Sequence, residues 1–126
     1  MEKTHGPLRK GKRTFFRAYV ELIRPFLKKI RTREADVLAE LLYHNYMKAD
    51  SVRNKEDRFK LILDHDSRRI MEDYLGISEA VFRNALSGLR QRGILLDDNT
   101  ISDAYLIYEL PEDEMFTLKF TFVIEN

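Results

Sequence analysis

The sequence predicts an α+β domain with a helical N-terminal half, a β-hairpin and an additional C-terminal β-strand. Three observations support this fold class. Apolar residues recur at helical spacing over most of residues 14–92. Gly76 and Gly93 stand where two of these helices would end, because the residue just past a helix often takes the left-handed conformation that glycine adopts easily. Apolar and polar residues alternate over residues 115–126, as in a strand with one buried face.

Length and composition indicate one ordinary domain. The 126 residues, 44% hydrophobic and 34% charged, match a soluble globular protein with a core of normal size. The chain has no cysteine, which excludes disulfides and thiolate zinc sites. It has neither an apolar leader nor a membrane-length apolar run. We therefore expect a cytoplasmic protein, or a component of a virion, with no membrane partner.

The net charge of +1 conceals a strong asymmetry along the chain. Residues 1–33 carry eleven Lys or Arg against two Glu, a net +9, whereas residues 97–126 carry one Lys against eight acids, a net −7. The first segment suits a polyanion and the last would repel one. Residues 1–13 are basic with almost nothing to bury, so we predict a flexible basic arm there, a domain at 14–110 and a C-terminal strand at 111–126. The arm is either a nucleic-acid backbone contact or a solvated tail.

Residues 14–63 predict two helices and one ambiguous segment. The buried face of the first helix comprises Phe16, Tyr19, Val20, Ile23 and Leu27, and Pro25 should kink or restart this helix. Thr32 is the predicted N-cap of the second helix, whose apolar stripe comprises Val37, Leu38, Leu41, Leu42 and Tyr46. Residues 48–55 form a polar loop. Residues 59–63 favour a short helix, with a β-strand as the alternative.

Two further helices are predicted on either side of Gly76. Asp66 is the expected cap of a helix over residues 67–75, with Ile70, Met71 and Tyr74 facing inward. Gly76 ends that helix, and Ser78 caps the next one after a connection of only two residues. Gly93 closes this last helix.

The end of the chain predicts strands. Residues 94–96, a turn at 97–99 and a β-rich run at 104–110 suggest a hairpin. Along residues 115–126 one face is wholly apolar, formed by Phe116, Leu118, Phe120, Phe122 and Ile124. This face packs either on the domain's own helices or, through a free strand edge, against another chain, which would give a homodimer or a complex with another protein.

The stretch from Ile70 to Leu95, IMEDYLGISEAVFRNALSGLRQRGIL, resembles the winged helix-turn-helix superfamily. That family has Leu-Gly-Ile-Ser, an apolar residue four positions after the Ser, leucines eight and eleven after it, and a Gly fifteen after it, before a β-hairpin wing. Those places hold Leu75-Gly76-Ile77-Ser78, Phe82, Leu86, Leu89 and Gly93. More loosely, the layout resembles small winged-helix proteins encoded by tailed bacteriophages. The resemblance implies an α+β winged helix.

The resemblance also implies that the helix over residues 79–92 reads bases in the major groove of duplex DNA. An Asn can bond an adenine edge and an Arg a guanine edge, each through two hydrogen bonds. The candidate base-reading residues are Ala80, Val81, Arg83, Asn84 and Ser87. The candidate phosphate contacts are Lys10, Lys12, Arg13, Arg68, Arg69, Arg90 and Arg92. Gly88 is expected on the same outward face.

Three features weigh against DNA binding, and the second of them would also suit packing against a partner helix. The predicted wing tip, residues 97–99, is acidic; Ala80, Val81 and Gly88 make the outward face partly apolar; and the C-terminal tail is acidic. A winged-helix protein-interaction module, such as a virion, packaging or polymerase-associated component, is therefore the alternative to a transcriptional regulator or phage DNA-handling protein.

The sequence shows no sign of an active site. It has no glycine-rich phosphate loop, dinucleotide fingerprint, zinc-protease motif or serine-hydrolase elbow. Asp64, His65 and Asp66 are adjacent in a predicted capping turn, where they would not converge on a metal ion. We therefore predict a DNA-binding protein that is not an enzyme and takes no cofactor or metal.

Overall fold

Five α-helices make up most of residues 11–110, the part of the chain that this computed structural model describes. They are α2 (Lys12–Ile23), α3 (Thr32–Lys48), α4 (Lys55–Ile62), α5 (His65–Leu75) and α6 (Glu79–Gln91). Two short 3₁₀ turns accompany them, η2 (Arg24–Phe26) and η3 (Asp103–Tyr105). None of these helices is long and apolar enough to cross a membrane.

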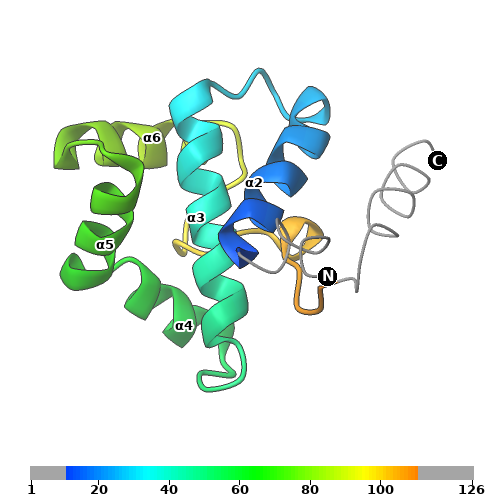
Figure 1. Cartoon of the computed structure of the whole chain (residues 1–126), viewed down its shortest axis with the longest axis vertical. Helices are drawn as coiled ribbons and strands as arrows, with labels where there is room; N and C mark the ends of the chain where they lie inside the picture. Colours follow the sequence, from blue (N-terminus) through cyan, green and yellow to red (C-terminus); the bar gives the residue numbers. More distant parts are fainter. Residues whose placement is uncertain (1–10, 111–126) are drawn as a thin grey trace, which may run out of the picture.

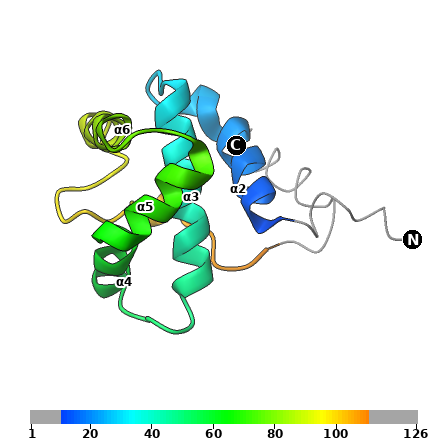
Figure 2. The ribbon, with the colours of Figure 1, turned by 60° about the vertical axis from the view of Figure 1, so that its left-hand side comes forward.

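Helix α3 lies at the centre of the fold. Helix α2 packs along one of its sides and α5 and α6 lie on the other, with α4 below them (Figure 1), and the turned view in Figure 2 shows the same order. The apolar stripe predicted for this helix is confirmed: Val37, Leu38, Leu41 and Leu42 are fully buried, and Tyr46 packs partly buried against the same core. Phe16 on α2 and Phe59 on α4 pack into the same core. Helix α3 therefore packs between α2 on one side and α5 and α6 on the other.

The interruption predicted at Pro25 is confirmed. Helix α2 ends at Ile23, and Pro25 sits in the 3₁₀ turn that follows, because proline has no N–H to continue the helical ladder. Leu27 and Ile30 are buried and hold the connection to α3 against the core. Helix α2 begins at Lys12, so the last residues of the predicted arm belong to the helix.

The short segment at 59–63 is helical, as favoured, up to Ile62, where α4 ends. Helix α5 starts earlier than predicted: the cap is Asp64, whose side chain accepts a 2.8 Å hydrogen bond from the Ser67 amide, and not Asp66. That amide hydrogen bond holds the pKa of Asp64 below its usual value. The inward placement of Ile70 and Tyr74 was wrong, since both are about half exposed and Met71 is the apolar side chain that α5 buries.

The predicted α+β winged helix was wrong. Residues 11–110 contain no β-strand; a single antiparallel bridge between Leu95 and Ile101 stands where the wing hairpin was expected. The predicted second strand, residues 104–110, begins instead in the 3₁₀ turn η3 and continues as irregular chain. The described part of the chain is helical.

Local side-chain hydrogen bonds explain why the hairpin does not extend. The Asp98 carboxylate accepts from both the amide and the hydroxyl of Thr100, at 3.0 and 2.7 Å, which closes a tight loop. Ser102 then accepts from the Ala104 amide and starts η3. Such bonds compete with a strand ladder for the backbone. The chain turns back toward α2, where the Tyr19 hydroxyl donates to the carbonyl of Tyr105 at 3.0 Å.

The sequence made two further predictions outside the described residues. The basic arm up to Lys10 and the strand at 115–126, with its choice between self-packing and a partner chain, lie in residues 1–10 and 111–126. They stay predictions.

Candidate nucleic-acid interface

Helices α5 and α6 form a helix–turn–helix unit whose turn is set by Gly76 and Ser78. Gly76 has the left-handed φ of +68°, which lets the amide of Ile77 donate to the carbonyl of Glu72 at 3.1 Å. The Ser78 hydroxyl accepts a 3.1 Å hydrogen bond from the Val81 amide and caps α6. Both predicted roles are confirmed, and so is the left-handed Gly93, at φ +76°.

The inner face of α6 is fixed by apolar packing. Phe82, Leu86 and Leu89 are at most 2% exposed, as the motif implied, and Ala85 is buried beside them. The guanidinium of Arg68 lies 6.0 Å from the centre of the Phe82 ring, so α5 covers that ring from the other side. The helix is therefore held in one orientation about its axis.

That orientation places the candidate base-reading residues outward. Ala80, Arg83, Asn84 and Ser87 are exposed, and Val81 is half-buried. Arg83 has one loose ion pair, 3.6 Å to the carboxylate of Glu79, in which both side chains are mostly exposed. Within the described residues, Asn84 and Ser87 engage no side chain or backbone group through their own side chains. The hydrogen-bonding groups of this face are thus available to a ligand.

Gly88 does not belong to this outward face, contrary to the prediction. It is buried against Glu34 of α3, and a Cβ atom at position 88 would lie 1.9 Å from Glu34 Oε2. A glycine in a helix interior costs about 1 kcal/mol relative to alanine. Here that cost has a reason, because any side chain would displace the carboxylate of Glu34.

Glu34 in turn holds Arg92, which was predicted to contact phosphate. Arg92 Nε donates to Glu34 Oε1 at 2.7 Å, and its Nη1 donates to the backbone carbonyl of Lys28 at 3.0 Å. Burial raises the pKa of Glu34, but the hydrogen bonds from the Arg92 side chain and the Arg31 amide outweigh it and lower the pKa overall. Arg92 therefore clamps the end of α6 to the start of α3, and its guanidinium is engaged within the fold.

The other candidate phosphate contacts divide into engaged and free side chains. Arg13 is engaged most fully: it makes three hydrogen bonds to the buried carboxylate of Glu40, and its guanidinium lies 4.0 Å from the centre of the Tyr74 ring. Arg68 donates to the carbonyl of Leu63, and Arg90 donates to the side chain of Asn99. Lys12 and Arg69 are exposed and in no ion pair among residues 11–110, although the Lys12 ammonium lies 5.8 Å from the centre of the Tyr46 ring; Lys10 lies outside these residues.

A basic segment that the site prediction missed lies beside the end of α6. Residues 24–33 contain five basic residues and no acid: Arg24, Lys28, Lys29, Arg31 and Arg33. Arg24 and Arg33 have acidic partners on neighbouring turns. Lys28, Lys29 and Arg31 are exposed and have no ion-pair partner in the described residues. The signal in the sequence is the run LKKIRTR at residues 27–33, which is part of the segment 1–33 with its net charge of +9.

The loop after α6 carries the opposite charge. Asp97 and Asp98 are exposed. Hydrogen bonds from the side chain and the amide of Thr100 lower the pKa of Asp98, so this carboxylate is ionised at neutral pH. A polyanion would be repelled here and attracted to the basic segment, so the favourable surface comprises the outward face of α6 and residues 24–33.

No family model, no curated protein and no solved structure matches this chain. The geometry of the α5–α6 unit is therefore the basis for a functional proposal.

Proposed function

We propose that this protein binds duplex DNA, with the outward face of α6 in the major groove. The observation that carries the proposal is the separation of the two faces of α6. Its inner face is locked by Phe82, Leu86 and Leu89, and its outer face holds hydrogen-bonding side chains that the fold leaves free. A rigid helix with such a face is what direct base readout requires.

The roles follow from the chemistry of the exposed groups. Asn84 has the donor and acceptor pair that matches the major-groove edge of adenine, and Arg83 has the fork that matches guanine. To reach a base, Arg83 must leave Glu79, which costs little because an exposed ion pair contributes at most about 1 kcal/mol. The methyl groups of Ala80 and Val81 suit contact with a thymine methyl.

The basic segment supplies the electrostatic part of the interaction. Arg92 ties the carbonyl of Lys28 to the end of α6, so the exposed cations of residues 28–31 have a fixed place beside that helix. Cations fixed at the border of a groove-binding helix are placed to contact the phosphate backbone, which sets register and affinity but carries no sequence information.

A protein-interaction module is the second candidate. One observation favours it: Ile70 and Tyr74 lie one turn apart on α5 and are 54% and 46% exposed. Exposed apolar side chains at helical spacing suit the groove of a partner protein. Such a module would not bind duplex DNA at moderate salt.

A salt-dependent titration tests the DNA proposal. We expect fluorescence anisotropy to show binding of a mixed-sequence duplex at ~50 mM salt, weakened about a hundredfold at ~200 mM if roughly four phosphates are contacted. The Lys28→Gln/Lys29→Gln variant should reduce the salt slope by about two. The matched control, Lys48→Gln/Lys60→Gln, removes the same charge at the far end of α3 and on α4, and should keep the parent slope. Failure to bind at ~50 mM salt would favour the protein module.

A further inference from the structure

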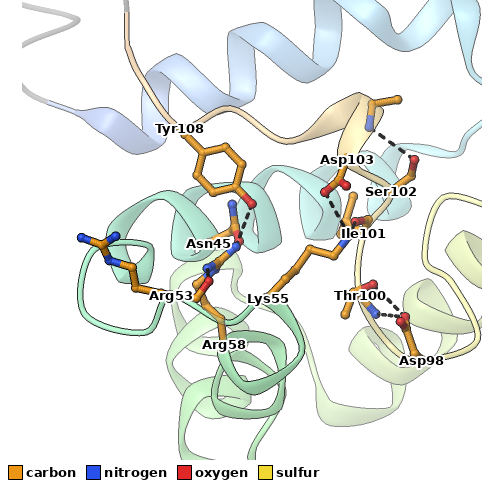
Figure 3. Close-up of polar contacts among 11 residues, drawn as sticks. Asn45, Arg53, Lys55, Arg58, Asp98, Thr100, Ile101, Ser102, Asp103 and Tyr108 are labelled. Carbon is orange, nitrogen blue, oxygen red and sulfur yellow. Dashed lines mark hydrogen bonds and ion pairs between the residues drawn. The ribbon is translucent and has the colours of Figure 1, made fainter.

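A pocket of about 350 Å³ lies at the other end of the molecule from α6, between the loop after α3, the start of α4 and the chain after η3. Figure 3 shows its main side chains, with Tyr108 lying over Arg58. Arg53, Lys55 and Arg58 line it, together with Asp50 and Asp103. This volume falls in the range of small-molecule sites. No motif in the sequence pointed to it.

Arg58 is the unusual group in this pocket. The residue is 2% exposed, yet no carboxylate in the described part of the chain pairs with it. It donates instead to neutral acceptors, the side chain of Asn45 at 2.7 Å, the hydroxyl of Tyr108 at 2.7 Å and two backbone carbonyls. Buried charges in proteins are generally paired, because an uncompensated one is costly. A negatively charged ligand would supply the counter-charge that Arg58 lacks.

The polar groups around Arg58 also have donors left over. Of its five N–H groups, the one on Nη2 that does not face Tyr108 is unused. The Tyr108 hydroxyl accepts from Arg58, so its own proton is free to be donated. Asn45, fully buried, turns Oδ1 to Arg58, which leaves its Nδ2 without a partner. The cluster therefore has three N–H or O–H groups without an acceptor, and an acceptor-rich group would satisfy donors of this kind.

The two carboxylates of the pocket do not fill that need. Asp103 is paired with Lys55, whose ammonium also donates to the carbonyl of Ile101. Asp50 is exposed and makes no ion pair within residues 11–110. The exposed guanidinium of Arg53 has no acidic partner there either. The lining therefore holds three cations, Arg53, Lys55 and Arg58, against the two carboxylates, and this net charge of +1 favours an anion.

We propose that this pocket binds a small molecule through an oxyanion group, a phosphate or a carboxylate, that neutralises Arg58. The anion accepts from Arg58 Nη2 and the Tyr108 hydroxyl, and Arg53 covers it from the entrance. A charged donor paired with an oxyanion gives the stronger class of hydrogen bond, and an Arg fork suits both phosphate and carboxylate. The site is independent of the outward face of α6, so it stands whether or not the chain binds DNA.

The test is an NMR titration of the whole protein with sodium phosphate, sodium acetate or sodium chloride at constant ionic strength. We expect saturable shifts of the amides at 53, 58 and 108 with phosphate, acetate or both, and none with chloride. Tyr108→Phe removes the hydroxyl that would donate to the anion, and with it one of the acceptors of Arg58, whereas Arg53→Gln removes the positive charge at the entrance and leaves the contacts of Arg58 intact; each should weaken binding about tenfold. The matched control is Lys60→Gln, which lies on α4 like Arg58 but outside the pocket; this variant should bind the anion like the parent.

The possible results of this titration distinguish an anion site in the pocket from the alternatives. Saturation by phosphate alone or acetate alone supports the site and identifies the class of anion. Equal responses to all three salts, or unchanged affinity in both pocket variants, would overturn it. A parallel titration with a DNA duplex completes the test: shifts at these amides with the duplex and with none of the three salts would overturn the site as well, because the pocket would then be part of a nucleic-acid surface.

Discussion

Phe82→Ala is expected to cost about 3–5 kcal/mol of unfolding free energy, because it empties a fully buried aromatic site between α6, α5 and α3. The total unfolding free energy of a small domain is only about 5–15 kcal/mol. The melting temperature should therefore fall by more than ~12 °C. Circular dichroism melts of the parent and the variant give the measurement.

Ser87→Ala is the matched control for this variant. Ser87 lies on the same helix but is exposed, so its substitution should change stability by less than ~0.5 kcal/mol. If Phe82→Ala melted like the parent while Ser87→Ala unfolded the protein, the inner and outer faces of α6 would be inverted.

Arg83→Ala and Asn84→Ala should each cost about 1–3 kcal/mol in affinity for a preferred duplex, because each removes a base-edge contact. Together the two substitutions should lower the affinity at least about thirtyfold if their contributions add. Neither residue packs in the core, so both variants should melt within a few degrees of the parent. Anisotropy titrations on a duplex selected from a random pool provide the affinities.

The control for these variants is Lys60→Ala on α4. It removes one exposed positive charge, as Arg83→Ala does, at a site away from α6 (Figure 1). It should leave the affinity for the selected duplex within about twofold of the parent. Full affinity in both α6 variants would show that this face does not read the DNA.

The parts of the fold that could be predicted from the sequence depend on local patterns. The turn at Gly76, the cap at Ser78 and the buried face of α6 are set by residues within a few positions of one another, so their spacing is visible in the chain. The same holds for the helix break at Pro25. Sequence patterns over a few neighbouring residues therefore predict these elements, and they also predict that Arg83 and Asn84 point outward.

The errors came from interactions between distant residues or from competing local bonds. The sequence predicts that Arg13 and Arg92 contact phosphate, but Glu40 and Glu34 engage them across 27 and 58 residues of sequence. Gly88 was placed outward because the close approach of α3 leaves no trace near it in the sequence. The predicted wing is wrong because the side chains of Asp98 and Ser102 form local hydrogen bonds with the backbone. These bonds turn a segment that strand propensity alone would make a β-strand.

The most direct test of the central proposal is a map of amide chemical shifts on adding a mixed-sequence DNA duplex at ~50 mM salt. DNA binding by the outward face of α6 predicts that the largest changes fall at residues 80, 83, 84 and 87 and along residues 28–31, with small changes on α4. Large changes confined to α4 and the segment after η3, or no changes at all up to an excess of duplex, would contradict the proposed interface.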